Sequence, residues 1–317
     1  MQLHEVIRRY QVYLCAVGIS PLTFSTMKCK LRLFEVWAEG CGVTTLEQLT
    51  VEIFWAYQEA LMFRLTRQGR PITMATQRQH LMALRAFGRY LVEQDFLISD
   101  PARKIKLPRA LNRLPRMIPD VHEAVRLMAS AMPNKQDHDR LQALSRSTRD
   151  RAILELLYST GLRRGEASHL NVADLDLVGG YVWVREGKGK KDRVVPLGHT
   201  AVTALTIYLD AVRSTMIADK EEDALFLNRY GGRLLGRGIY EVVRKAVVCA
   251  RLSRKITPHS LRHAAATHML QNGAPIRHLQ EFLGHASIDT TQVYTRITIP
   301  ELKATHAKYH PREKEEE

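Results

Sequence analysis

The 317-residue sequence contains few cysteines and no long hydrophobic run. Its four cysteines are widely spaced and form no CxxC pair: Cys15, Cys29, Cys41 and Cys249. This spacing predicts neither a disulfide framework nor a zinc site, so we expect buried, reduced thiols. No segment approaches the roughly 20 apolar residues of a membrane span, and the N-terminus MQLHEVIRRYQVYL lacks the apolar core of a signal peptide. We therefore expect a cytoplasmic protein with no membrane partner.

Two signatures of enzymes that act on phosphates are also missing. The sequence contains no P-loop pattern GxxxxGK[ST], which argues against a bound nucleotide. It also lacks the clustered carboxylates of a two-metal nuclease. Asp174 and Asp176 alternate with Leu175 and Leu177, a pattern that predicts exposed positions on a strand. We therefore predict chemistry without a metal or cofactor.

What the sequence does contain is an excess of positive charge. Lys and Arg number 47 against 33 Asp and Glu, which gives a formal net charge of +14. A basic protein favours a polyanion as its partner. A membrane surface is the competing interpretation, but it normally requires a basic amphipathic helix or a long apolar stretch, and neither is present.

The chain is longer than one hydrophobic core usually organises, so two domains are expected. Residues 1–101 predict four helices: one over 3–16, one after Ser20-Pro21, one after Thr50, and one through 81–91 that ends near Asp100-Pro101. Residues 102–118 contain six Lys or Arg, two prolines and no acid. This composition predicts a basic linker, with a solvated loop as the alternative.

The second domain, residues 119–317, is expected to combine helices with one small sheet. Residues 171–177 and 181–186 alternate toward the turn GKGKKD, and residues 193–197 return, which predicts antiparallel strands with a lysine-rich tip. Helices are predicted over 200–216, 236–250, 258–271 and 275–283. The predicted fold class is therefore mainly α with a small antiparallel β-sheet.

A histidine and an arginine share the start of one predicted helix. Thr257-Pro258 provides an N-cap and a first-turn proline, so His259 and Arg262 lie three residues apart on one face. The backbone N–H groups and the helix dipole favour an anion there, and a phosphate would fit. The helix over 275–283 should end at Gly284, where His285 can turn back toward this site.

Other candidate residues are ambiguous when taken alone. Tyr294 follows at a position where a buried tyrosine is far commoner than a nucleophile. Arg163 precedes Glu166 by three residues, and a solvated surface pair of this kind contributes at most about 1 kcal/mol. The lysines of the turn could likewise only keep a hairpin tip soluble.

Together these segments resemble the tyrosine recombinase family, which includes phage integrases and Xer-like site-specific recombinases. The resemblance rests on TGLRRGE (160–166), GKGKKDRVVPL (187–197), HSLRHAAATHML (259–270) and LGHASIDTTQVYTR (283–296), with a helical N-terminal half. It covers nearly the whole chain. Its specificity comes from six residues in the family's order: Arg163, Lys188, His259, Arg262, His285 and Tyr294.

The resemblance implies that Arg163 and Arg262 bind the scissile phosphate and that Tyr294 attacks it. Two guanidinium groups suit this role because cleavage builds negative charge on the phosphate oxygens, and Arg can bind them bidentately. A tyrosine with a pKa near 10 needs a base, for which His259 is the candidate.

The remaining roles follow from the same resemblance. His285 would hold the phosphate or the tyrosine, and Glu166 would support the first arginine. Lys188 would protonate the leaving 5′ hydroxyl, although Lys190 or Lys191 could reach the same place if the turn is shifted by two residues.

The resemblance further implies double-stranded DNA with paired inverted half-sites as the partner, and a homo-oligomer that forms a tetramer on DNA. Whether a second recombinase takes part stays open. Basic residues expected to contact DNA lie in the linker and the hairpin: Lys104, Lys106, Arg109, Lys190 and Lys191. The segment IPELKATHAKYHPR resembles the helix that relatives dock into a neighbouring protomer. The terminal EKEEE matches no family motif and is expected to be solvated.

Two features depart from the family pattern. Residues 132–149 resemble an insertion that breaks a helix with polar sequence. We also expect no arm-binding domain of the kind that some phage integrases carry, which favours an Xer-like enzyme or one carried by a transposon or plasmid. The expected function is DNA strand exchange between two sites, through a 3′-phosphotyrosine intermediate and a Holliday junction. The alternatives are a sequence-specific DNA-binding regulator and a DNA-relaxing enzyme of the type IB topoisomerase class.

Overall fold

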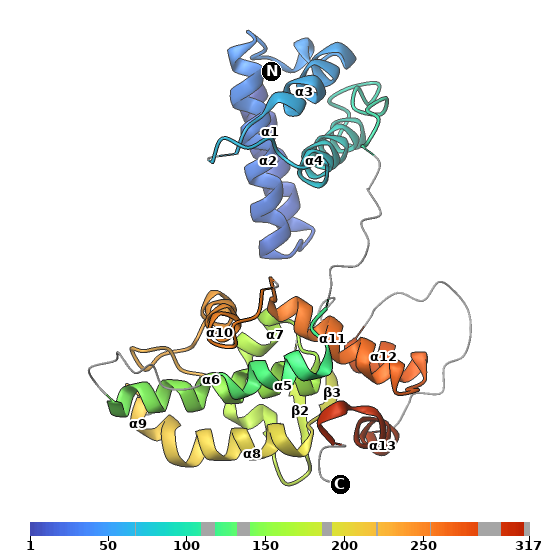
Figure 1. Cartoon of the computed structure of the whole chain (residues 1–317). Coiled ribbons are helices and arrows are strands. Elements are labelled where there is room, and N and C mark those ends of the chain that lie inside the picture. The colour runs from blue at the N-terminus through green and yellow to red at the C-terminus, as the bar shows by residue number, and fades with distance from the viewer. Residues whose placement is uncertain are drawn as a thin grey trace. The chain divides into compact units, whose positions relative to one another are not determined.

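The structure is a computed structural model in which the chain forms two compact units, residues 1–114 and 115–317 (Figure 1). The described residues are 1–66, 68–108, 118–131, 140–185, 192–219, 221–253, 255–284 and 299–313. The division between the units falls inside the predicted linker 102–118. Within the described residues, no helix is both long and apolar enough to span a membrane.

The N-terminal unit contains the four predicted helices. They are α1 (Leu3–Ala16), α2 (Pro21–Gly40), α3 (Val51–Phe63) and α4 (Met74–Glu93), with one 3₁₀ turn at Leu46–Gln48. The Ser20 hydroxyl accepts a hydrogen bond from the Thr23 backbone N–H, which confirms the predicted N-cap before α2. Phe34, Phe54 and Phe87 are fully buried where these helices meet.

Three expectations for this half of the chain require correction. Helix α4 ends at Glu93, not near residue 100, because Asp95 adopts a left-handed φ of 56° and the Phe96 N–H bonds back to the Leu91 carbonyl. Ala102 and Ile105, at the start of the predicted linker, are buried in the N-terminal core. All four cysteines are exposed: Cys15, Cys29 and Cys249 lie on outward-facing parts of their helices, and Cys41 lies in the turn after α2.

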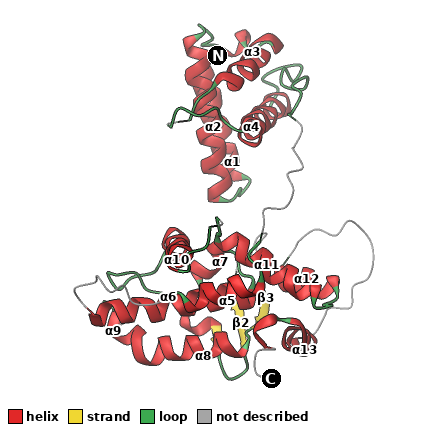
Figure 2. Ribbon diagram, in the orientation of Figure 1, coloured by secondary structure: helices red, strands yellow, loops and turns green. Residues whose placement is uncertain are grey.

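The second unit is mainly helical with one small sheet (Figure 2). Its helices are α5 (Val121–Ala129), α6 (Arg140–Thr160), α7 (Arg164–His169), α8 (His199–Tyr208), α9 (Ser214–Met216), α10 (Gly236–Cys249), α11 (Pro258–Gln271), α12 (Ile276–Leu283) and α13 (Ile299–Tyr309). The strands β1 (Leu175–Asp176), β2 (Tyr181–Val184) and β3 (Arg193–Pro196) pair antiparallel in the order β1-β2-β3. The predicted fold class is confirmed.

The first predicted strand is shorter than expected. Val172–Asp174 forms a 3₁₀ turn, and only Leu175 and Asp176 pair with β2. Asp174 is buried, not exposed, because its carboxylate forms an ion pair with Arg185 at 2.7 Å and accepts from the Asn171 N–H. The 3₁₀ turn thus replaces the first part of the predicted strand, and the Asp174 carboxylate bonds to groups of the protein and not to solvent.

Helix α6 organises the second core. Residues 152–158 are completely buried, and the helix packs against α5, α8, α10 and α11 (Figure 1). The helix begins at Arg140, so residues 140–149 are helical although their polarity suggested an insertion that breaks a helix. Hydroxyl groups in this part donate to carbonyls of the same helix, as Ser145 does to Leu141, and this accommodates the polar sequence.

The C-terminal helix α13 is fastened to the end of α6 by two buried imidazoles. His306 Nε2 donates to the Ser159 carbonyl at 2.8 Å, and His310 Nε2 donates to the Tyr158 carbonyl at 3.2 Å. The two imidazole rings stack with centroids 4.5 Å apart. The chain end therefore belongs to the core of the second unit.

Two charged residues after α13 also bond to the second unit. Arg312 pairs with the buried Glu155 at 2.7 Å, and the Glu313 carboxylate accepts from the His199 backbone N–H at the start of α8. The expectation that EKEEE is solvated is therefore wrong for Glu313, because a carboxylate at a helix N-terminus is stabilised by the unpaired N–H groups there. The other four residues lie outside the described residues.

Candidate active site

The first candidate arginine lies where the chain turns from α6 into α7. Helix α6 ends at Thr160, and Gly161 then takes a left-handed φ of 58°, a conformation that favours glycine. Arg163 is the N-cap residue of α7. The Glu166 carboxylate accepts from the Arg163 backbone N–H at 2.8 Å and from its Nη1 at 2.7 Å. The pair predicted from TGLRRGE is therefore partly buried and bonded at two points.

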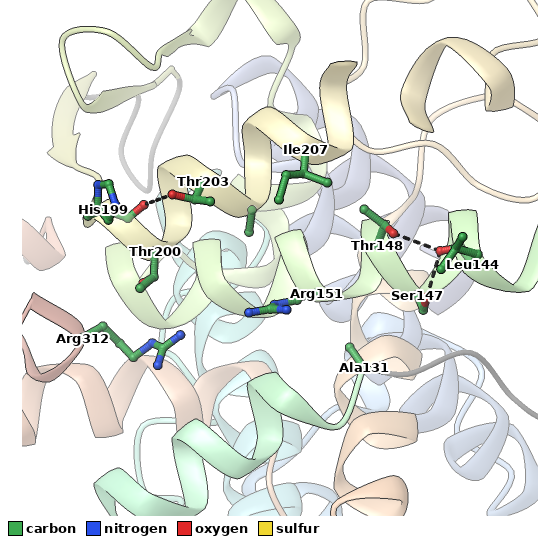
Figure 3. A pocket seen from close by; sticks show the side chains of 11 residues that line it. Ala131, Leu144, Ser147, Thr148, Arg151, His199, Thr200, Thr203, Ile207 and Arg312 are labelled. Atoms are coloured by element: carbon green, nitrogen blue, oxygen red, sulfur yellow. Dashed lines mark hydrogen bonds between the residues drawn. The ribbon is translucent and has the colours of Figure 1, made fainter. Parts of the chain in front are cut away.

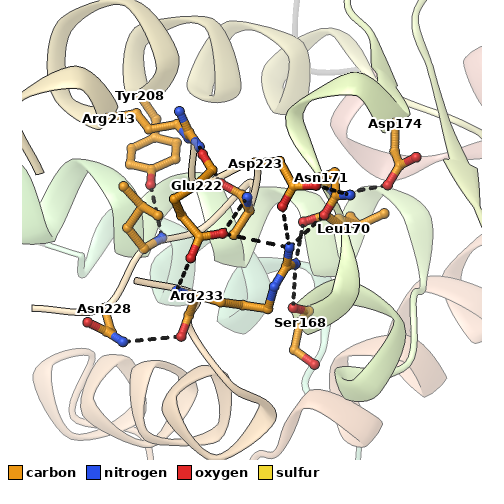
Figure 4. Close-up of polar contacts among 12 residues, drawn as sticks. Ser168, Leu170, Asn171, Asp174, Tyr208, Arg213, Glu222, Asp223, Asn228 and Arg233 are labelled. Atoms are coloured by element: carbon orange, nitrogen blue, oxygen red, sulfur yellow. Dashed lines mark hydrogen bonds and ion pairs between the residues drawn. The ribbon is translucent and has the colours of Figure 1, made fainter. Parts of the chain in front are cut away.

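Helix α7 is held at its other end by Arg233. This guanidinium donates to the Leu170 carbonyl at 3.1 Å, to Asn171 Oδ1 at 2.7 Å and to Asp223 Oδ1 at 2.8 Å (Figure 4). Arg or Lys near the last carbonyls of a helix satisfies groups that have no partner inside the helix. The short α7 thus has side-chain bonds at both ends, which limits how far Arg163 can shift.

The second candidate arginine, Arg262, is almost completely buried, with 5% of its surface exposed. Its Nη1 donates to the Gly161 carbonyl at 2.6 Å and its Nη2 to the Leu283 carbonyl at 2.5 Å. Arg163 Nη2 reaches the next carbonyl, that of Gly284, at 3.4 Å. Two arginines that are 99 positions apart in the sequence therefore meet at the C-terminal end of α12.

The charges in this cluster influence one another. Burial, followed by the nearby charge of Arg163, lowers the pKa of Arg262 to about 10. At neutral pH this arginine is still protonated, so both guanidinium groups are cationic. Because like charges this close repel, a bound anion would relieve the repulsion, as expected for a phosphate site.

A third arginine, Arg193, belongs to the same cluster and was not singled out from the sequence. It is the first residue of β3, and its Nη1 and Nη2 donate to the two oxygens of Glu166 at 3.1 and 2.8 Å. Burial alone would raise the pKa of Glu166, but hydrogen bonds and charge from Arg193, followed by bonds from Arg163, lower it to about 2. The only sequence signal for a role of Arg193 was its position directly after the lysine-rich turn.

His259 lies in the first turn of α11, as predicted. The Thr257 hydroxyl caps this helix by accepting from the Ser260 N–H, and Pro258 occupies the first position. His259 is exposed, and its ring lies 5.5 Å from that of His263 between centroids. An exposed imidazole three residues before a buried arginine could reach a substrate that the arginine binds.

Helix α12 ends where the sequence predicted. Gly284 has a left-handed φ of 63° and caps the helix, so the carbonyls that bind the arginines directly precede His285 in the chain. Lys188, His285 and Tyr294 lie outside the described residues, as do Arg109, Lys190 and Lys191. Lys104 and Lys106 are exposed in the N-terminal unit.

A cavity of about 430 Å³ lies elsewhere in the second unit, between α6 and α8 (Figure 3). Its lining includes Arg151, Arg312 and several hydroxyl groups, and none of the candidate catalytic residues. A duplex requires an open surface, so this cavity does not compete with the arginine cluster as the site. Among the described residues, no group of three or more His, Cys, Asp or Glu is arranged to hold a metal ion.

Comparison with known proteins agrees with this geometry. Residues 122–299 match the phage integrase family. The chain is 36% identical to tyrosine recombinase XerC 2 of Ralstonia nicotianae, covering 97% of this chain and 87% of the relative. It is 40% identical to tyrosine recombinase XerD of Oceanobacillus iheyensis, covering 79% of this chain and 80% of the relative.

A solved structure shares the fold. The lambda integrase tetramer bound to a Holliday junction matches with a TM-score of 0.67 and 17% identity, covering 94% of this chain and 81% of that one. The arginine cluster, the helical fold with its small sheet and these matches lead to one conclusion: the chain belongs to the phage integrase family of tyrosine recombinases.

Proposed function

We propose that this protein is a site-specific recombinase that cleaves and rejoins DNA through a 3′-phosphotyrosine intermediate. The observation that carries the proposal is the meeting of Arg163 and Arg262 at the end of α12. The two guanidinium groups are planar, stay charged and lie close together, so they suit a phosphate whose negative charge grows during the reaction. Family membership favours this function over a DNA-binding regulator or a type IB topoisomerase.

The proposed reaction begins with attack by Tyr294 on the scissile phosphorus. The bond between the phenolic oxygen and phosphorus forms while the bond from phosphorus to the 5′ oxygen breaks. His259 takes the phenolic proton, and Lys188 gives a proton to the leaving 5′ oxygen. One phosphoester replaces another, so the 5′ hydroxyl of a different strand can reverse the step without a nucleotide cofactor.

The arginines stabilise the transition state in this scheme. Arg163 and Arg262 would exchange their carbonyl acceptors, Gly284 and Leu283, for phosphate oxygens, which accept more strongly because they are charged. His285, the next residue, would then bond to the phosphate or to the tyrosine. Lys188 is the proposed acid, and Lys190 or Lys191 would take its role if the turn were shifted by two residues.

The proposed substrate is a pair of DNA sites, each with two inverted half-sites. Two protomers would bind each site and four would assemble at the synapse, as the lambda integrase tetramer on a Holliday junction suggests. Lys104 and Lys106, both exposed, would contribute phosphate contacts from the N-terminal unit. Arg109, Lys190 and Lys191 complete the proposed set of DNA-contacting residues.

The test is the Tyr294→Phe variant on a cognate site. The parent should form a covalent protein–DNA adduct that survives denaturation, whereas the variant should bind the same DNA and form none, because it lacks the nucleophilic oxygen. Denaturing gel electrophoresis of labelled DNA measures the adduct. An adduct that persists in the variant would remove Tyr294 from the mechanism, and relaxation of a plasmid without a site would favour the topoisomerase class.

A further inference from the structure

Arg193 connects three parts of the candidate site. Its guanidinium forms two parallel hydrogen bonds with Glu166, and that carboxylate also binds Arg163. The side chains of Arg193 and Glu166 are only 13% and 7% exposed, so solvent screens this pair weakly. Arg193 also starts β3, one residue after Asp192 and directly beyond the lysine-rich turn.

The same side chain lies against the end of α12. A Cβ atom on Gly284 would lie 2.9 Å from both Cδ and Nε of Arg193, closer than carbon atoms approach. The Gly284 carbonyl in turn accepts from Arg163. Arg193 is therefore in contact with the two groups, Glu166 and Gly284, that determine where the Arg163 guanidinium points.

We propose that Arg193 is a positioning residue for DNA cleavage: through Glu166 it orients Arg163 and keeps the positive charge of Arg163 available to the scissile phosphate. The inference rests on the proposed function. Its physical basis is a count of charges: the guanidinium groups of Arg163, Arg193 and Arg262 lie close together around one carboxylate, and those of Arg163 and Arg193 bond to it. Without Arg193, Glu166 would neutralise Arg163 alone, and the site would lose one of its two excess positive charges.

Arginine is required here for a geometric reason. A planar guanidinium can bond to both carboxylate oxygens at once, whereas a lysine ammonium is a single point charge that cannot fix the plane of the carboxylate. That plane matters, because Glu166 Oε1 accepts from Arg163 Nη1 while Oε2 accepts from its backbone N–H. A rotated carboxylate would break one of these bonds.

The test compares two substrates that differ only in charge. One carries the normal phosphate at the cleavage position, and the other carries an uncharged methylphosphonate, which leaves Arg163 with less negative charge to stabilise. Arg193→Met should bind the site with nearly the parent's affinity and cleave the phosphate roughly 10- to 100-fold more slowly. On the methylphosphonate the difference between variant and parent should largely disappear. Single-turnover cleavage of labelled duplexes measures both rates.

Two further variants complete the design. Arg193→Lys keeps the charge but not the paired bonds, so its rate on the phosphate should fall between those of the parent and Arg193→Met. Arg244→Met, on α10, removes the same charge from an exposed position whose partner Glu241 is also exposed, and any loss it shows should be equal on the two substrates.

Three results would overturn the proposal: cleavage at the parent's rate by Arg193→Met, equal losses by that variant on both substrates, or, if Arg193→Met does not fold, equal losses on both substrates by Arg193→Lys. If the parent itself forms no covalent adduct, the proposed function fails and not only the role of Arg193.

Discussion

At the scale of single residues, the candidate site depends on one carboxylate among several arginines. Glu166 bonds to Arg163 and Arg193, and its charge also counteracts the effect of both on Arg262. A carboxylate in an exposed ion pair contributes little to the free energy of unfolding, but removing one from a buried pair leaves buried cations without a counter-charge. The sequence predicted the Glu166–Arg163 pair, and it could not show that a third arginine shares it.

We expect Glu166→Gln to destabilise the protein by about 3 kcal/mol, because the amide leaves two adjacent, partly buried guanidinium groups without a counter-charge. Urea denaturation at neutral pH measures the change in the free energy of unfolding. The matched control is Glu241→Gln, which removes an exposed glutamate paired with Arg244 and should cost less than about 1 kcal/mol. Equal effects of the two substitutions would contradict the structural account of Glu166.

At the scale of elements, the attachment of α13 depends on histidines that must stay neutral. Burial lowers the pKa of His306 to about 4 and lowers that of His310 in the same direction. Each Nε2–H already donates to a carbonyl of α6, and a second proton would place a charge on a ring that is buried from solvent. The helix is therefore held by bonds that acid would weaken.

We expect the free energy of unfolding to fall as the pH drops from about 6.5 toward 4. Above pH 6.5 these histidines are neutral in both states, and below it the unfolded chain gains protons that the folded chain excludes. His306 alone should account for roughly 3 kcal/mol over this range. Urea denaturation at several pH values between about 7.5 and 4 measures the slope.

The control variants for this slope are His306→Gln and His122→Gln. An amide at residue 306 can still donate to the Ser159 carbonyl but does not titrate, so the dependence on pH should become weaker. His122 is exposed on α5, and its substitution should leave the slope unchanged. If neither substitution alters the slope, His306 is not the group that titrates.

At the scale of the whole molecule, the excess of positive charge should dominate affinity for DNA. Each lysine or arginine that contacts a phosphate releases a counterion, so binding weakens with salt in proportion to the number of contacts. With a formal net charge of +14, several such contacts are expected. Sequence readout would come from contacts with base edges in the grooves.

We expect the affinity for DNA to fall at least about 10-fold between about 50 and 200 mM salt. If six phosphates are contacted, the fall should be about 10³-fold. Fluorescence anisotropy with the Tyr294→Phe variant measures binding without cleavage. Lys104→Ala, at an exposed residue, should reduce the slope of log affinity against log salt by about one. An affinity that does not change with salt would contradict electrostatic binding.

The sequence by itself predicted the four helices of the N-terminal unit, the helices over 200–216, 236–250, 258–271 and 275–283, and the identity of the candidate catalytic residues. Helix starts such as Ser20-Pro21 and Thr257-Pro258 depend on local bonds, and the end of α12 depends on the freedom of Gly284 to adopt a positive φ. These signals lie within a few residues of one another, so they can be read without a structure.

Only the tertiary structure decided which distant residues meet. Three bonds join segments that are far apart in the chain: Arg193 to Glu166, Arg262 to the Gly161 carbonyl, and the His199 N–H of α8 to Glu313. The corrected predictions also depend on distant contacts. Asp174 forms an ion pair with Arg185, and Ala102 packs into the hydrophobic core of the N-terminal unit. Long-range packing and ion pairing leave no local pattern in a sequence, because the partner of a charge is set by the fold.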